Sequence, residues 1–249
     1  MVNKIINSLS EYELKARIFP AFFTICPFLI TILIWFPKLI RLESSLVISL
    51  ILVVTLIFLG NLARERGKKI QKKLIQKWGS LPATLHLSHL DNTLDIETKK
   101  RYRNYLEKNI KDLKLPSQNE EIENPKNSQA KYESAIKWLL ENTRDSQKFP
   151  LVHQDNITYG YSRNMLGIKP LGVTVSILSL ILNVYLLYSS NYQSITEVTS
   201  STLFSILASF IFCISWLFFV NEKWVESTSN AYARTLLSSC ETPTIKSSS

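Results

Sequence analysis

Four long stretches of the sequence contain no charged residue, and each holds a core of about 18 or more mostly apolar residues. They cover residues 18–37, 44–63, 170–196 and 198–221. A helix needs about 20 such residues to cross the hydrocarbon core of a bilayer. The alternative, a buried helix of a soluble protein, seldom runs this long without a charge. The pattern therefore predicts four transmembrane helices, paired as two hairpins. Their expected bounds are about 18–37, 45–63, 169–189 and 201–220.

Between the second and third spans, apolar residues recur at helical spacing, as in Ile70, Leu74 and Trp78. Helices are expected in "ARERGKKIQKKLIQKWG", "DIETKKRYRNYLEKNIKDL" and "AKYESAIKWLLENTRD". The segment "SLPATLHLSHLD" alternates between polar and apolar residues and contains Pro82, so we expect it to be extended.

The expected fold class is an all-α membrane protein, with two transmembrane hairpins and a mainly helical cytoplasmic insert. The division follows the charge pattern. Residues 1–63 form an N-terminal tail and the first hairpin, 64–168 a basic cytoplasmic domain, 169–221 the second hairpin, and 222–249 a cytoplasmic C-terminal tail.

Lys and Arg are distributed unevenly among the loops, which sets the expected orientation. Residues 64–169 carry 21 Lys and Arg against 13 Asp and Glu, and the loop between the third and fourth spans has no basic residue. Cytoplasmic loops carry an excess of Lys and Arg. Lys38 and Arg41 in the first loop weaken this bias without reversing it. We expect a multi-pass protein of the bacterial inner membrane, in contact with membrane lipid, with both termini in the cytoplasm.

Three of the predicted spans carry small or polar residues on one helical face. The candidate seam consists of Thr24, Thr31, Ser176, Ser179, Asn183, Ser205 and Ser209. One interpretation is helix packing, because small residues let helices approach and hydroxyl and amide groups hydrogen-bond between them. The other is a path for water or ions, lined by these residues when several copies assemble into a homo-oligomer. Asn183 is the group most costly to leave facing lipid, so we expect it at a helix contact.

The motif "YGYSRNMLGIKPLG" immediately precedes the third span. Its candidate elbow residues are Gly160, Arg163, Gly167, Lys169 and Pro170. The glycines allow tight turns or close backbone packing, and proline suits the first turn of a helix. We interpret the motif as an elbow at the membrane surface; the alternative is a hinge that passes a cytoplasmic event to the last two spans.

No catalytic motif, phosphate-binding loop or dinucleotide fingerprint is present, and we predict neither catalytic residues nor a cofactor. The closest approach to a metal-binding pattern is "HLSHLD", which places His86, His89 and Asp91 together. On an extended strand the two histidines would point to opposite faces, so hydrogen-bonded or exposed histidines are the preferred interpretation. A metal-dependent enzyme using these three residues is the alternative.

The segment "RERGKKIQKKLIQK" has seven positive charges and one negative charge. Next to a membrane, such a segment sets topology and attracts anionic lipid. It could instead bind the phosphates of a nucleic acid, an interpretation to which "KKRYRNYLEK" adds interleaved aromatic residues.

A resemblance rests on "KKIQKKLIQKWGSLPAT", "KYESAIKWLLENTRDSQKFPLV" and "NITYGYSRNMLGIKPLG". These segments resemble a family of small, mostly uncharacterised four-span bacterial inner-membrane proteins, and the match covers roughly residues 60–172. Similar membrane proteins encoded beside retrons act as transmembrane effectors of phage defence. The resemblance implies that a reverse transcriptase–nucleic acid complex restrains the protein until infection.

The polar stripes, the basic insert and this resemblance favour a toxin-like effector that disrupts the inner membrane when a cytoplasmic partner releases it. The alternative is a non-toxic membrane scaffold, or accessory subunit, that recruits a cytoplasmic partner.

Overall fold

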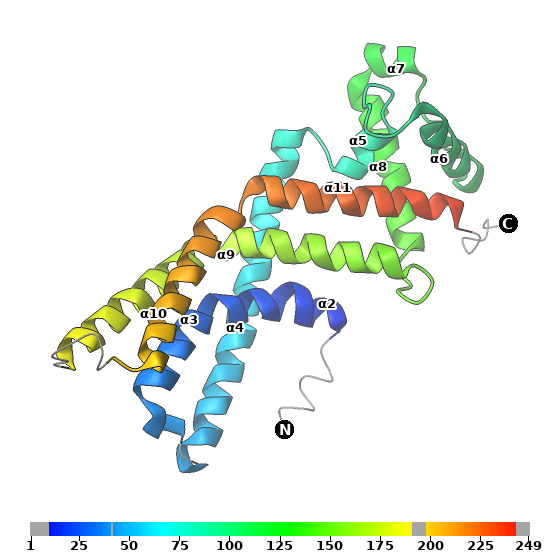
Figure 1. The fold of residues 1–249 in the computed structure, drawn as a ribbon. Coiled ribbons are helices and arrows are strands. Elements are labelled where there is room, and N and C mark those ends of the chain that lie inside the picture. The colour runs from blue at the N-terminus through cyan, green and yellow to red at the C-terminus, as the bar shows by residue number, and fades with distance from the viewer. Residues whose placement is uncertain (1–9, 41, 191–197, 243–249) are drawn as a thin grey trace. The chain divides into compact units, whose positions relative to one another are not determined.

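The computed structural model of the chain describes residues 10–40, 42–190 and 198–242. Within these ranges the protein consists of helices and loops, without a strand (Figure 1). Four helical stretches are long and apolar enough to cross a membrane. The first nine residues, Arg41 and the end of the predicted C-terminal tail lie outside the described residues.

The apolar stretches belong to long or joined helices. The elements are α2 (Glu11–Glu13), the π-helix η1 (Leu14–Ile18), α3 (Phe19–Trp35), the 3-10 helix η2 (Pro37–Ile40), α4 (Leu42–Trp78), α9 (Pro150–Ser189), α10 (Ser200–Ile214) and the π-helix η4 (Ser215–Phe219). The remaining elements are α5 (Pro82–Leu87), α6 (Ile96–Asn109), α7 (Gln118–Glu123), α8 (Pro125–Asn142), α11 (Glu222–Ser238) and the 3-10 helix η5 (Ser239–Glu241).

The chain folds into two compact units, and their boundaries differ from the predicted ones. The span unit comprises Met1–Lys72 and Gly160–Val225, and the polar unit comprises Lys73–Tyr159 and Glu226–Ser249. Residues 64–72 and 160–168 of the predicted cytoplasmic domain (64–168) therefore belong to the span unit. The boundaries differ because α4 and α9 each continue without a break from an apolar segment into a charged one.

In the span unit, α3 packs along α10 and its continuation η4. The Phe23 ring lies 4.7 Å from that of Phe212 and 5.4 Å from that of Trp216, which is fully buried. By contrast, the apolar part of α4 is largely exposed, with Leu50, Ile51 and Phe58 at 60–65% exposure. Apolar side chains on the outside are expected where lipid replaces water as the solvent.

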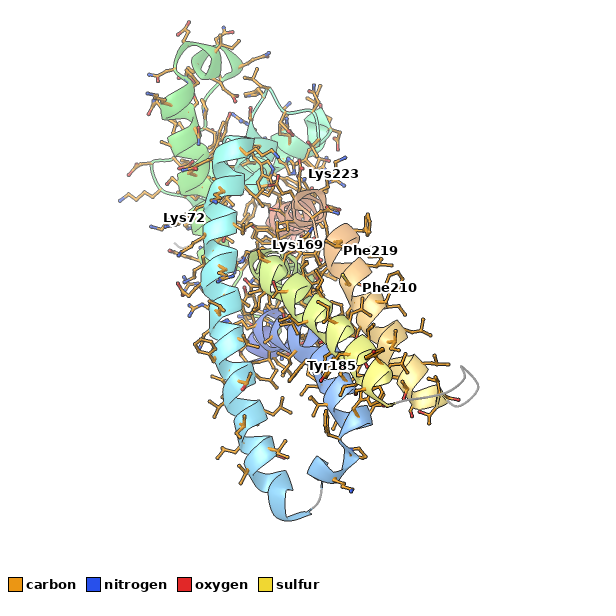
Figure 2. The ribbon with its side chains drawn as sticks, turned by 90° about the vertical axis from the view of Figure 1, so that its left-hand side faces the viewer. Lys72, Lys169, Tyr185, Phe210, Phe219 and Lys223 are labelled. Atoms are coloured by element: carbon orange, nitrogen blue, oxygen red, sulfur yellow. The ribbon has the colours of Figure 1, made fainter. Side chains whose placement is uncertain are left out.

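Pro170 lies inside α9 and not in its first turn as predicted. Proline has no N–H to complete the helical bond, and its ring crowds the preceding turn, so it kinks a helix without always ending it. Figures 1 and 2 show α9 changing direction near its middle, where Lys169 is labelled. The chain thus changes direction at Pro170 within one continuous helix.

The polar unit has a hydrophobic core of its own. The core is formed by Ala83, Leu87, Tyr102, Leu106, Leu115, Tyr132, Ala135, Ile136, Leu139, Phe149, Val152, Ala233, Leu236, Leu237 and Cys240. Within the segment predicted to be extended, Pro82–Leu87 form the helix α5, so the prediction was wrong for these residues. Pro82 occupies the first position of α5, where the missing N–H costs nothing. Helix formation also lets Ala83 and Leu87, four residues apart, face the core together.

The predicted C-terminal tail contains the helix α11, whose last turns enter this core. The Tyr232 ring stacks on that of Tyr159 with the centroids 6.1 Å apart. Thr235 donates a hydrogen bond to the Asp155 carboxylate. Burial raises the pKa of the Cys240 thiol to about 12. The second half of α11 and η5 thus complete the polar unit.

Candidate functional site

The side chain of Asn183 lies at the centre of a polar junction between α3, α9 and α10. Its amide oxygen accepts a hydrogen bond from the Trp35 Nε1–H at 2.8 Å. Its amide nitrogen donates to the hydroxyl oxygens of Thr31 (2.8 Å) and Ser209 (3.3 Å). The Ser205 hydroxyl lies 3.5 Å from that of Thr31. We call these five residues the Asn183 junction.

Every residue of the candidate seam is fully buried inside the span unit. The set is Thr24, Thr31, Ser176, Ser179, Asn183, Ser205 and Ser209, each with 0% exposure. Hydroxyl groups on α3 and α9 also donate to backbone carbonyls one turn earlier, as Thr24 does to Pro20 and Ser176 does to Gly172, both at 2.8 Å. The seam is therefore closed and its hydrogen bonds are made within one chain, so it can line a path only if the helices separate.

A second junction joins α4 to α9 at two glycines. A Cβ atom added to Gly167 would lie 2.5 Å from the backbone nitrogen of Gly67, closer than a side chain permits. A Cβ atom added to Gly67 would collide with the amide oxygen of Asn164. The two helix backbones therefore approach as closely as their atoms allow at this crossing, which we call the glycine crossing.

Asn164 connects the glycine crossing to η1. Its amide nitrogen donates to the carbonyl of Ala16 at 2.6 Å. Pro20, four residues after Ala16, has no N–H with which to make the α-helical bond to that carbonyl. The fully buried Asn164 side chain thus supplies a donor where the sequence of the first span removes one.

The remaining elbow residues on α9 make specific contacts within the span unit. The guanidinium of Arg163 donates to the side-chain oxygen of Gln71 and to the Tyr12 hydroxyl, the latter at 3.1 Å. Gly160 faces Tyr12 and Ala16, with the Tyr12 hydroxyl 2.6 Å from where its Cβ would be. Gly160 thus leaves room for Tyr12, and one turn later Arg163 is long enough to reach both Tyr12 and Gln71.

Lys169 caps the end of the last span. Its ammonium group donates to the carbonyls of Leu217 (3.0 Å) and Val220 (2.8 Å). A cation is favourable at a helix C-terminus, where carbonyl groups have no helical partner. One turn away, Gly172 packs against the Trp216 indole, and any Cβ there would overlap the ring.

The histidine cluster is not arranged as a metal site. His86 is on α5 and is 3% exposed, with its Nδ1 3.4 Å from an Asp91 carboxylate oxygen. The backbone N–H of His89 instead donates to Glu121 at 2.9 Å. Among the described residues, no group of three His, Cys, Asp or Glu is placed to hold a metal ion.

Glu121 belongs to a buried network in the polar unit. Its carboxylate accepts hydrogen bonds from the hydroxyls of Ser88 and Tyr132. Arg103 donates to the Tyr132 hydroxyl at 2.9 Å and to the backbone carbonyls of Leu87, at the end of α5, and Pro116. Burial raises the pKa of the Tyr132 hydroxyl to about 12, so this group remains a neutral donor. The network fixes the loops around α5 and α7.

Sequence reasoning missed the partners of the seam and elbow residues. Gly67 and Asn164 were not singled out. A signal was present for both, because Gly60, Ala63 and Gly67 recur at helical spacing on α4, as do Gly160, Asn164 and Gly167 on α9. Such stripes of small residues mark close helix packing in membranes.

No protein-family model matches this sequence, and the searches of curated proteins and solved structures found no match.

Proposed function

We propose that this protein is a membrane-embedded effector that permeabilises the bacterial inner membrane without an enzymatic reaction. In its resting form the three-helix seam is closed within each copy. Separation of the helices would present the seam residues to a second copy, and the assembled oligomer would carry ions along the polar surface.

The observation that carries this proposal is the Asn183 junction. It places an amide and three hydroxyl groups among spans that carry no charge in their apolar stretches. Polar side chains inside a membrane are costly, and they commonly mark packing contacts or ion pathways. The junction is therefore the part of the span unit best suited to switch between a closed and a conducting arrangement.

The hydrogen bonds of the Asn183 junction contribute a free energy that is small enough for a partner to overcome. Four side-chain contacts join the helices at this point: Trp35–Asn183, Asn183–Thr31, Asn183–Ser209 and Ser205–Thr31. At about 0.6 kcal/mol for each such bond in a membrane protein, they contribute roughly 2–3 kcal/mol to closure. If these contacts alone set the closed–open equilibrium, the open state would be about 0.1–10% of the population, which a partner can raise or suppress.

The proposed restraint is a cytoplasmic partner that binds the closed form. The exposed cations at the end of α4, including Lys68 and Lys72, are suited to contact a nucleoprotein. Residues 60–172 resemble a family of small bacterial inner-membrane proteins, and similar membrane proteins are encoded beside retrons. By analogy with these, we propose a reverse transcriptase–nucleic acid complex as the partner. With both termini in the cytoplasm, as the loop charges predict, α4 would emerge on the side where that complex is made.

The test is membrane potential in cells that express the full chain from a tightly controlled promoter, measured with a potential-sensitive dye beside a viability count. We expect the wild type to depolarise cells before growth stops. The triple variant Asn183→Leu, Ser205→Leu, Ser209→Leu should abolish depolarisation at equal protein abundance. Thr174→Leu removes an exposed hydroxyl from the same helix and is the matched control, expected to behave as wild type.

Depolarisation by the triple variant at the wild-type rate would contradict conduction through the seam. If the wild type alone leaves the potential unchanged, the measurement is repeated with its neighbouring genes and phage. Unchanged potential there as well would overturn the effector function.

A non-toxic scaffold is the second candidate, and the surface of the polar unit favours it. Leu90, Ile96 and Ile122 are 62%, 82% and 62% exposed outside the predicted spans. Large apolar side chains exposed on a soluble surface often mark a protein contact. The scaffold predicts a stable complex with a cytoplasmic partner that Ile96→Asp and Ile122→Asp disrupt, together with an unchanged membrane potential during infection.

A further inference from the structure

The span unit contains an apolar groove beside the end of α10. Its volume is about 470 Å³, within the usual range for small-molecule sites of about 300–1,000 Å³. The groove is lined by Phe23, Tyr161, Met165, Ser215, Phe218, Phe219, Val220, Asn221 and Trp224. These residues come from α3, α9, η4 and the start of α11, so the groove exists only because the helices meet here.

The local sequence explains why this space is not filled. Residues 215–219 form a π-helix, which carries one more residue in each hydrogen-bonded turn than an α-helix and often occurs at functional sites. The largest side chain of this segment, Trp216, is directed inward against Phe23 and Gly172 and is fully buried. Ser215, which lines the groove, contributes only a hydroxymethyl group.

The groove lies where the chain changes from apolar to charged. Phe218 and Phe219 are each 70% exposed on its border, and Glu222 and Lys223 follow directly. The Tyr161 and Trp224 rings meet edge to face at 5.8 Å. Tyrosine and tryptophan are enriched where the hydrocarbon core meets the headgroups. The groove thus has an apolar interior at the expected level of the membrane surface.

The border of the groove carries positive charge. The Lys169 ammonium lies 2.8 Å from the carbonyl of Val220, a lining residue. Lys223 is exposed and adjoins Trp224, while Glu222 is the acidic residue next to it. Figure 2 shows Lys169, Phe219 and Lys223 at this end of the span unit. Glu222 and Glu226 are the acids of this part of α11, so attraction for an anionic headgroup comes from the Lys223 ammonium together with Lys169.

We propose that this groove binds one acyl chain of an anionic phospholipid, with the headgroup phosphate beside Lys223. An amphiphile matches both parts of the site, because the groove is apolar and its border is cationic. This inference is independent of the proposed function, since the groove would hold the lipid whether or not the protein conducts ions.

The test uses the purified full chain in lipid nanodiscs that contain a trace of phosphatidylglycerol with a photoactivatable group in one acyl chain. Irradiation followed by peptide mass spectrometry locates the attached lipid. We expect attachment concentrated on residues 215–224 and 161–165. Ser215→Phe should fill the groove and lower attachment there at least about fivefold, because a bound chain and the added ring would overpack the same space. Thr174→Phe, at an exposed site on α9, is the matched control and should leave attachment unchanged.

A second comparison tests the headgroup. A phosphatidylcholine probe with the same acyl group should attach less than the phosphatidylglycerol probe. Lys223→Gln should reduce that preference about fivefold, the contribution expected of one cation near an anionic surface. Lys72→Gln, exposed on α4, should not change it.

Two results would overturn the proposal. Equal attachment along the exposed face of α10, unaffected by Ser215→Phe, would mean that the lipid is only part of the surrounding annulus. Equal attachment of the two probes would exclude selection of an anionic headgroup. Size-exclusion chromatography and circular dichroism verify that Ser215→Phe is folded, and Ser215→Leu provides a smaller filling residue if it is not.

Discussion

Gly67 on α4 and Gly167 on α9 meet so closely that a Cβ atom on Gly167 would lie 2.5 Å from the Gly67 backbone nitrogen. The helices are brought together by their backbones at this crossing and not by interlocking large side chains. Hydroxyl, amide and small side chains replace the hydrophobic effect as the basis of helix association in a membrane. The glycine crossing, near the middle of α9, and the Asn183 junction, near its C-terminal end, are two applications of this rule.

Gly167→Ala should destabilise the span unit by about 1–3 kcal/mol, because the added methyl group cannot be accommodated without moving a backbone. At an ordinary helix interior position, the same substitution stabilises by about 0.5–1 kcal/mol. A loss of stability would therefore indicate a close helix crossing at Gly167, and a gain would indicate an ordinary helix position. Thermal unfolding in detergent measures it, and Thr174→Ala on the same helix is the control. A rise in the melting temperature of Gly167→Ala would contradict the crossing.

Asn183→Leu should lower the stability of the span unit by about 1–3 kcal/mol, because the Trp35 N–H and two hydroxyl groups lose their partner in a water-free interior. The Trp35 indole should also lose its hydrogen bond, which shifts its fluorescence. Thr174→Val serves as the control, because its hydroxyl is exposed and bonds only its own helix. Unchanged stability and fluorescence would show that the junction does not hold the helices together.

Lys169→Gln should loosen the end of the last span, because the carbonyls of Leu217 and Val220 lose a charged donor. A cation at a helix C-terminus contributes about 0.3–1 kcal/mol, and more when it is partly buried. Hydrogen exchange of the amides in residues 217–224 should increase several-fold, while exchange in α4 stays unchanged. Lys72→Gln, which removes an exposed cation, controls for the loss of charge alone.

The polar unit should lose stability as the pH falls. Burial raises the pKa of the Glu121 carboxyl, but hydrogen bonds from Ser88, His89 and Tyr132 outweigh it and hold that pKa below its ordinary 4.5. Burial, with the nearby Arg103, lowers the pKa of His89 below its ordinary 6.5. Because both pKa values are lower in the folded state, the unfolded state binds more protons at low pH.

The stability that His89 and Glu121 contribute to the polar unit is fully present above pH 6.5 and is lost in two steps as the pH falls. The His89 contribution is lost as the pH falls from 6.5 through its folded pKa, and that of Glu121 as it falls from 4.5 through its own. Hydrogen exchange of α6 and α8, corrected for intrinsic rates, measures this loss. Glu121→Gln should reduce the lower step, whereas Glu141→Gln, exposed on α8, should retain it. A pH-independent exchange pattern in the wild type would contradict the network.

Some parts of the structure were predictable because they depend on short-range patterns. The charge-free stretches identified the four apolar helices, and the helical spacing of Tyr102 with Leu106 and of Tyr132 with Ile136 identified two helices of the polar unit. The prediction failed at Pro82, which begins a helix and does not lie in an extended segment, and at Pro170, which lies inside a helix and not in its first turn. Only the surroundings decide which of these positions a proline takes.

Which helices are apolar, and which of their faces carry small or polar residues, could be predicted from the sequence, because both depend on local composition and on a period of 3.6 residues. Tertiary structure alone decided what those faces meet: Asn183 with Trp35 and Thr31, Gly67 with Gly167, and Asn164 with the Ala16 carbonyl. These pairs are about 100 or more residues apart, and each depends on the rotation and depth at which two helices pack. Small differences in that packing would change every partner while leaving the sequence pattern the same.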